Sequence, residues 1–303
     1  MVARLVHRYG TCDTGYPGAR SATLDEVVPG CTVLFGQASS ARAGELDGRT
    51  AAARALRDAA HLESPGEYVD FRRKQPPVRA DLLDLGDLAP GPDRQALDAA
   101  SREIVRRGGR PVLLGGAMDD ALTCLDAALA AGQMAHPAPS ASATMRSVFI
   151  SPGLDWAAQA MGLPGLGGGL ALGTHDLVSL QALSRLQSAG WPLLSASACV
   201  QADQPPLQTR LAAWLGTDGP VFVVLDMSCI DMGFAAGASG DNVGGLEPLE
   251  FLAVVEAVAS RGRLGGAAIV NLLPERDPRG HSERLAAKAL ALLLGMRPHG
   301  VDH

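Results

Sequence analysis

One short segment constrains the fold more than any other. Val221–Asp226 reads VFVVLD, five apolar residues in a row followed by a carboxylate. A strand with one solvent-exposed face alternates apolar and polar residues, whereas a strand that is covered on both faces reads as a continuous apolar run. The segment therefore predicts a central strand of a parallel sheet with helices on both sides.

Similar apolar runs alternate with segments of helical spacing along most of the chain. Further strands are predicted at Thr32–Gly36, Ala80–Asp87, Pro111–Gly116, Ser147–Ser151 and Ala267–Leu272, and helices at Arg49–Ala60, Asp93–Arg107, Asp119–Ala131, Leu177–Ala189, Pro248–Arg261 and Ser282–Leu294, with Ser282 as the N-cap of the last. Residues 1–30 are predicted to be an irregular lead-in, and residues 157–169, which are rich in glycine, to be irregular too. The alternation predicts one α/β domain over 31–303, a three-layer α-β-α sandwich around a mainly parallel sheet.

Charge and cysteine content exclude several classes of function. The 303 residues carry 26 Lys and Arg against 32 Asp and Glu, a net charge of −6 without a basic stripe, which argues against nucleic acid as a partner. Every apolar run is too short or too charged to span a bilayer, and the N-terminus lacks the apolar core of a signal peptide. The five cysteines are odd in number and have no CxxC spacing. We therefore expect a cytoplasmic protein without a disulfide framework.

The segments that directly follow the predicted strands are the first place to look for chemistry. In open parallel sheets, ligands bind beyond the carboxyl ends of the strands. Four such ends carry polar residues: Gly115–Asp119, Ser151–Asp155, Asp226–Asp231 and Asn271–Pro274.

The order and spacing of these segments resemble the ureohydrolase family, which includes arginase, agmatinase and formimidoylglutamase. Six pieces carry the resemblance: Gly48–Arg54, Leu83–Asp87, Gly115–Gly116, Ile150–Asp155, Leu225–Gly245, and Val270–Pro274 with Asp277–Pro278 downstream. The resemblance covers nearly the whole chain from residue 31. It implies the arginase-like sandwich with about eight strands, and a homotrimer or homohexamer.

The resemblance also implies a dinuclear manganese site, but the ligand positions have changed. Taken position by position, they fall on Met118, Ser151, Gly153, Asp155, Asp226 and Ser228. Only Asp155 and Asp226 are carboxylates, and hard divalent cations need several oxygen or imidazole ligands. The carboxylate that grips a guanidinium group in the family falls on Asn271. We therefore expect no metal cofactor, and without it no metal-activated water as nucleophile.

Each candidate catalytic residue has an alternative structural role. Asp155 and Asp226 are either a repurposed polar site or acceptors for backbone N–H groups at strand ends. Cys229, beside Ser228, is either a nucleophile or a small buried hydrophobe. His175 either enters the site or anchors its loop by hydrogen bonds.

The candidates for ligand contact are Met118, Asp119, Ser151, Gly153 and Asn271. Met118 fills the volume of an imidazole as an apolar plug, or serves as a thioether ligand of a soft metal. Asp119 either faces the ligand or places its charge in the first turn of a helix. Gly162–Gly169 lacks the context of a dinucleotide fingerprint and is interpreted as a loop over the cleft.

Two functions remain open at this point. The first is an inactive ureohydrolase homologue that binds a small guanidino or amide ligand, or a partner such as an active paralogue. The second is a divergent hydrolase that acts on a C–N bond of a guanidino, amidine or amide substrate through Asp155, Asp226, Ser228, Cys229 and His175. The first hypothesis predicts a cleft that is filled by Met118, and the second predicts a nucleophile within hydrogen-bond reach of a base.

Overall fold

The computed structural model describes residues 5–6, 15–37, 51–63, 81–88, 94–135, 144–175, 177–201, 204–215, 219–240, 243–295 and 297–298. The starts of two predicted helices, Arg49 and Asp93, lie outside these residues, as does Cys12. No helix in the described ranges combines the length and the apolar character that a membrane crossing requires.

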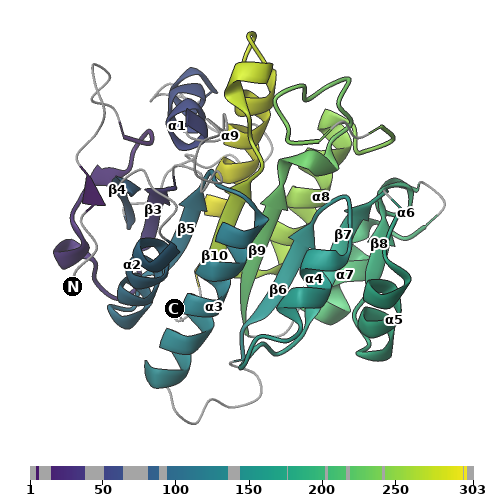
Figure 1. Ribbon diagram of the computed structural model, residues 1–303, viewed down its shortest axis with the longest axis horizontal. Helices are drawn as coiled ribbons and strands as arrows, with labels where there is room; N and C mark the ends of the chain where they lie inside the picture. Colours follow the sequence, from purple (N-terminus) through teal and green to yellow (C-terminus); the bar gives the residue numbers. More distant parts are fainter. Residues whose placement is uncertain are drawn as a thin grey trace.

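Eight neighbouring parallel strands form the body of the sheet, in the order β4-β3-β5-β10-β9-β6-β7-β8 (Figure 1). They are β3 Thr32–Gly36, β4 Leu82–Leu88, β5 Arg110–Leu114, β6 Arg146–Ile150, β7 Gly169–Thr174, β8 Leu193–Ser195, β9 Pro220–Asp226 and β10 Arg263–Val270. Short strands extend the sheet: β1 (Leu5–Val6) pairs antiparallel with β4, while β2 (Arg20–Ser21) and β11 (Arg297–Pro298) pair parallel with β4 and β10. The mainly parallel sheet of about eight strands is thereby confirmed.

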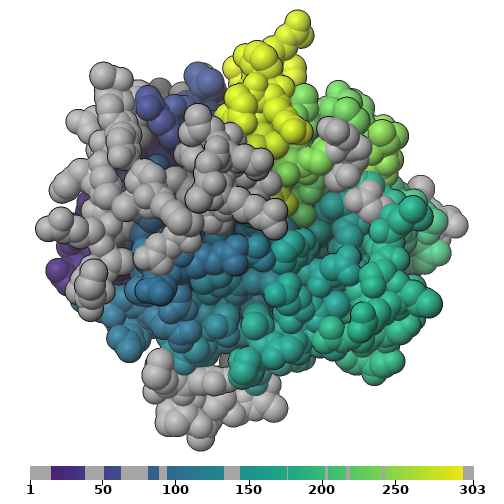
Figure 2. All heavy atoms as spheres, in the orientation of Figure 1, coloured from purple at the N-terminus to yellow at the C-terminus, as the bar shows by residue number. Residues whose placement is uncertain are grey.

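Helices cover both faces of this sheet and complete the predicted three-layer fold. One face packs against α1 (Ala52–Glu63), α6 (Ala196–Val200), α7 (Leu207–Leu215), α8 (Pro248–Arg261) and α9 (His281–Leu294). The other packs against α2 (Arg94–Arg106), α3 (Met118–Ala135), α4 (Asp155–Ala160) and α5 (Leu180–Ser188). The second layer forms the blue-to-teal front of the molecule in Figure 2.

Strand β9 shows why a continuous apolar run marks the centre of such a sheet. Its odd-numbered residues Val221, Val223 and Leu225 point into the first helical layer, and Phe222 and Val224 point into the second. Successive side chains of a strand alternate between faces, so burial on both faces makes every position apolar. The register pairs Leu225 with neighbours on both sides, so the carboxyl ends of β10, β9 and β6 are level.

The glycine-rich stretch is more regular than predicted. Residues 155–160 form α4, and three of its alanine side chains are buried against the core. The glycines begin only after this helix ends. Strand β7 then starts at Gly169. The intervening loop lies at the amino end of the sheet, where Gly167 N–H donates to Met145 O and Ser147 N–H donates to Gly168 O. It therefore does not cover the carboxyl ends, and the prediction of a loop over the cleft is wrong.

The start of the last helix also differs from the prediction. Helix α9 begins at His281, and its N-cap is Gly280 with φ 67°. Ser282 is not the cap, because its hydroxyl donates to Asp277 and accepts from Gly237 N–H. A left-handed N-cap glycine has no signature in the sequence patterns that mark helix starts.

The predicted lead-in contains ordered structure. Besides β2, it holds the 3₁₀ turn η1 (Leu24–Glu26), and Tyr16 is buried in the first helical layer. The strand pairs of β1 and β2 with β4 join this region to the sheet. The division of the chain into a lead-in and one domain stays a prediction.

Candidate functional site

Three neighbouring strands end at one buried carboxylate. Asp226 is the last residue of β9, Ser151 directly follows β6, and Asn271 directly follows β10. Since β10, β9 and β6 are adjacent and level in the sheet, these residues meet at its carboxyl edge. Ser228 joins them from the 3₁₀ turn η4 (Met227–Cys229) that follows β9. The structure thus brings together four of the candidate residues that the sequence indicates.

Neutral donors surround Asp226. Its Oδ1 accepts from Ser228 N–H at 3.0 Å, from the Ser228 hydroxyl, and from Asn271 Nδ2 at 2.9 Å. Its Oδ2 accepts from Ser151 Oγ at 3.1 Å. Four donors therefore occupy most of the acceptor positions of the two oxygens.

Burial has the largest effect on the pKa of this carboxyl. Asp226 is 2% exposed. Desolvation raises the pKa of Asp226, and the hydrogen bonds from Ser228, Asn271 and Ser151 offset only part of that rise. Neutral donors stabilise the carboxylate less than a full positive charge would.

The other acidic and ligand candidates lie elsewhere or make different contacts. Asp155 is exposed in the first turn of α4 and makes no hydrogen bond or ion pair with the described part of the chain. Asp119 lies in the first turn of α3, where its carboxylate accepts from Arg94 at 2.6 Å. Gly153 has free space where a Cβ would lie. Met118 is 2% exposed and packs in the second helical layer, consistent with an apolar filler.

The two candidate nucleophilic or basic residues occupy structural positions. Cys229 is fully buried in the first helical layer, and burial raises the pKa of its thiol well above the ordinary value. His175 anchors its loop, because its backbone N–H donates to Pro152 O at 3.1 Å and its Nδ1 lies 3.1 Å from Gly173 O. A thiol of raised pKa in an apolar core is a poor nucleophile.

Asp231 organises the loop that follows η4. Its Oδ1 accepts from Gly233 N–H at 2.8 Å and its Oδ2 from Gly244 N–H at 2.7 Å. These backbone hydrogen bonds lower the pKa of Asp231. The carboxylate therefore supports the turn.

The residues around Asp226 do not fit a dinuclear manganese centre. Such a centre needs several carboxylate or imidazole ligands, whereas Ser151, Ser228 and Asn271 supply hydroxyl and amide groups that already donate to Asp226. Among the described residues, no group of three or more His, Cys, Asp or Glu side chains could hold a metal ion.

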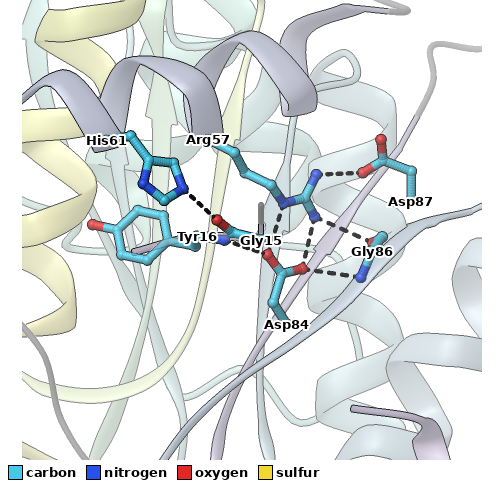
Figure 3. A network of polar contacts seen from close by, with 7 residues as sticks. All are labelled: Gly15, Tyr16, Arg57, His61, Asp84, Gly86 and Asp87. Atoms are coloured by element: carbon cyan, nitrogen blue, oxygen red, sulfur yellow. Dashed lines mark hydrogen bonds and ion pairs between the residues drawn. The ribbon is translucent and has the colours of Figure 1, made fainter. Parts of the chain in front are cut away.

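A second buried carboxylate lies near the edge of the sheet, on β4 (Figure 3). Asp84 accepts two hydrogen bonds from the guanidinium of Arg57 on α1, at 2.8 and 2.9 Å, and one from Tyr16 N–H at 2.9 Å. The same guanidinium donates to Asp87 at 2.5 Å. His61 lies one turn further along α1, and its Nε2 is 2.8 Å from Gly15 O. The network fastens the lead-in to α1 and β4.

The Arg57 guanidinium reverses the effect of burial on Asp84. Desolvation alone raises the pKa of this carboxyl, but the charge and hydrogen bonds of Arg57, with backbone donors from Tyr16 and Gly86, hold it below the ordinary value. Sequence reasoning missed Arg57. The signal was a carboxylate inside the apolar run Leu82–Leu85, since a buried carboxylate needs a partner of opposite charge.

Part of the chain matches a known family in sequence. Residues 172–295 match the model of the arginase family. A segment of 109 residues is 26% identical to the mitochondrial agmatinase of Gallus gallus, and the match covers 36% of this chain and 32% of the agmatinase. These findings show that this part of the chain is similar in sequence to the arginase family. The chain thus matches only a third of the length of that curated relative.

Solved structures share the fold over most of the chain. The formimidoylglutamase of Bacillus subtilis subsp. subtilis str. 168 superposes with a TM-score of 0.72 at 17% identity, covering 97% of each chain. The proclavaminate amidino hydrolase of Streptomyces clavuligerus gives 0.71 at 16% identity, covering 92% of this chain and 95% of that one. A hypothetical agmatinase of Burkholderia thailandensis gives 0.70 at 19% identity, covering 88% and 85%. At these identities the likeness establishes the arginase-like fold.

Proposed function

We propose that this chain is an arginase-fold protein that has given up ureohydrolase chemistry and acts by binding a small guanidino or amide ligand or a partner protein. The observation that carries the proposal is the donor set around Asp226. Ser151 and Ser228, which fall on ligand positions of the family, and Asn271, which falls on the guanidinium-gripping position, all donate to this one carboxylate.

The geometry supports binding over hydrolysis for a chemical reason. The family activates water with its metal ions. The hydroxyls of Ser151 and Ser228 do reach a carboxylate, Asp226, but all three side chains are buried and therefore shielded from a substrate. Cys229 is buried with a raised pKa, and the Ser228 hydroxyl donates to Asp226 rather than to an imidazole. General-base activation of a hydroxyl requires a base that can release the proton it takes up near neutral pH.

Location and assembly are part of the same proposal. We place the protein in the cytoplasm as a homotrimer or homohexamer, and an active paralogue is one candidate partner. Multi-angle light scattering of the purified chain distinguishes these assemblies from a monomer.

The test is turnover under conditions that favour catalysis. The purified chain is incubated with excess Mn²⁺ and a panel of guanidino, amidino and amide compounds, with an active ureohydrolase treated identically. We expect no urea, ammonia or amide product above the protein-free background. Turnover that disappears in Asp226→Asn would support the divergent hydrolase instead. A thermal-shift screen of the same compounds then identifies the ligand class.

A further inference from the structure

Asn271 has an unusual backbone conformation. With φ 63°, it is the one non-glycine residue of positive φ within the described ranges. Hydrogen bonds hold it there from both sides, since its N–H donates to Gly116 O at 3.0 Å and its carbonyl accepts from Ser239 N–H at 2.8 Å. Asn and Asp adopt this left-handed conformation at lower cost than other side chains. The position thus demands Asn, Asp or Gly for backbone reasons alone.

The side chain of Asn271 completes a cluster that spans three strands. Its Nδ2 donates to Asp226 Oδ1, while Ser151 Oγ reaches Oδ2 from the opposite side of β9. Asn271 follows β10 and Ser151 follows β6, and these are the two neighbours of β9 in the sheet. Through Gly116 O, Asn271 also contacts the end of β5. One carboxylate therefore links the carboxyl ends of adjacent strands.

The energetic cost of burying a charge explains why Asp226 accepts hydrogen bonds from all of these donors. A buried carboxylate costs several kcal/mol unless opposite charge or hydrogen bonds compensate it. No ion pair reaches Asp226 in the part of the chain that the structure describes. The donors of Ser151, Ser228 and Asn271 therefore supply together the positive potential that a cation would otherwise provide.

We infer that Asp226 and its donors Ser151, Ser228 and Asn271 form a metal-free clamp, a set of hydrogen bonds that joins the ends of β6, β9 and β10. Asn271 is its positioning residue, because its Nδ2 supplies a donor to the carboxylate instead of a cation. The inference rests on the proposed function in one respect, because it requires that no metal occupies Asp226. It goes further in stating which neutral donors compensate Asp226 and which single substitution should make the cluster respond to divalent cations.

That substitution is Asn271→Asp. Asp has nearly the same size and tolerates the same left-handed backbone, but it replaces a donor by an acceptor. Two carboxylates then face each other, and an excess of divalent cation relieves part of their repulsion. The native clamp has no such dependence. Asn271→Gly is the matched variant, because it keeps the backbone conformation and removes the donor without adding charge.

The experiment measures Tm of the native chain and of both variants at pH 7, in EDTA and in excess Mn²⁺. We expect the native Tm to be the same in both solutions. Asn271→Gly should melt about 5 °C lower in both. Asn271→Asp should melt lower still in EDTA and recover part of the loss on addition of Mn²⁺.

The other outcomes separate the two proposals. A native Tm that falls in EDTA would overturn both the clamp and the proposed function. A native Tm indifferent to EDTA, with Asn271→Asp as stable as the native chain and unaffected by Mn²⁺, would overturn the clamp alone. If Asn271→Asp does not fold, Asn271→Gly decides: a lowered Tm supports the clamp, and an unchanged Tm contradicts it.

Discussion

Asp84 and Asp226 are both strand residues, both 2% exposed and both surrounded by hydrogen-bond donors, yet their environments shift their pKa values in opposite directions. Asp84 faces the Arg57 guanidinium, and its pKa is lowered. Asp226 faces hydroxyl, amide and backbone N–H groups, and its pKa is raised. The difference shows that hydrogen bonds from neutral groups offset only part of the cost of burying a carboxylate, whereas a full positive charge reverses it.

The comparison also shows two ways in which this fold compensates a buried carboxylate. At the sheet edge, Asp84 and Arg57 form a complete pair within the chain, so nothing external is required. At the carboxyl edge, the same need is met at Asp226 by Ser151, Ser228 and Asn271. Neutral donors at Asp226 thus take the part that the Arg57 guanidinium takes at Asp84. Three predictions test this contrast.

The largest effect is expected from Arg57→Ala. It leaves Asp84 buried without its opposite charge, and breaking a buried pair in this way costs about 3–5 kcal/mol. Urea unfolding monitored by circular dichroism measures the loss. Arg54→Ala is the control on the same helix, because Arg54 is half-exposed and pairs with Asp58 at 3.7 Å. We expect the control to cost less than about 0.5 kcal/mol. Equal losses for the two variants would contradict the role given to Arg57.

A smaller effect is expected from Ser151→Ala. It removes one of four donors to Asp226, and a hydrogen bond to a charged group contributes about 1.5–3 kcal/mol. The same unfolding assay applies. Ser147→Ala on β6 is the matched control, since Ser147 is fully buried and its hydroxyl has no hydrogen bond within the described residues. We expect the control to be neutral or slightly stabilising. A control that costs as much as Ser151→Ala would show that neither loss reports on Asp226.

The smallest effect is expected in the pH dependence of stability, where the two carboxyls should contribute with opposite signs. The lowered pKa of Asp84 means that its ionisation stabilises the fold above the ordinary value of about 4, and that this contribution is lost as pH falls through the folded pKa. Asp226 behaves oppositely. Between the ordinary pKa and the raised folded pKa, the folded chain keeps a proton that the unfolded chain has released, so the contribution of Asp226 to stability weakens as pH rises through this interval.

The contributions of the two carboxyls to stability can be separated by comparing the native chain with single variants. Stability is measured from pH 3 to 8 for the native chain, Asp84→Asn and Asp226→Asn. The native advantage over Asp84→Asn should shrink on acidification, while the native advantage over Asp226→Asn should grow. A tenfold difference in proton affinity between the folded and unfolded chains corresponds to about 1.4 kcal/mol of stability. Parallel curves for the two variants would mean that the two sites do not differ as described.

The sheet could be predicted from the sequence because burial on both faces leaves a local signal. Val221–Asp226 is apolar at every position before its final carboxylate, and β9 has helices on both sides. Two predictions were wrong where the sequence pattern was weak. The alanines of α4 precede glycines that obscure the helical pattern, and the cap of α9 depends on the backbone angle of Gly280.

The site could be predicted as a set of positions but not as a set of contacts. Strand ends identified Ser151, Asp226 and Asn271, because parallel strands bring their carboxyl ends together. Their hydrogen bonds depend on register and on the φ of Asn271, which no sequence pattern gives. The exposure of Asp155 and the partner of Asp84 are tertiary properties of the same kind.

The most direct test of the account is the metal content of the native chain. The protein is purified after growth with Mn, Ni, Zn and Fe supplied, beside an active ureohydrolase, and both are analysed by inductively coupled plasma mass spectrometry. We expect the control to retain its manganese while this chain holds only traces of any metal. One or more tightly held ions per chain, lost in Asp226→Asn, would contradict the central claim that neutral donors have replaced the metal at Asp226.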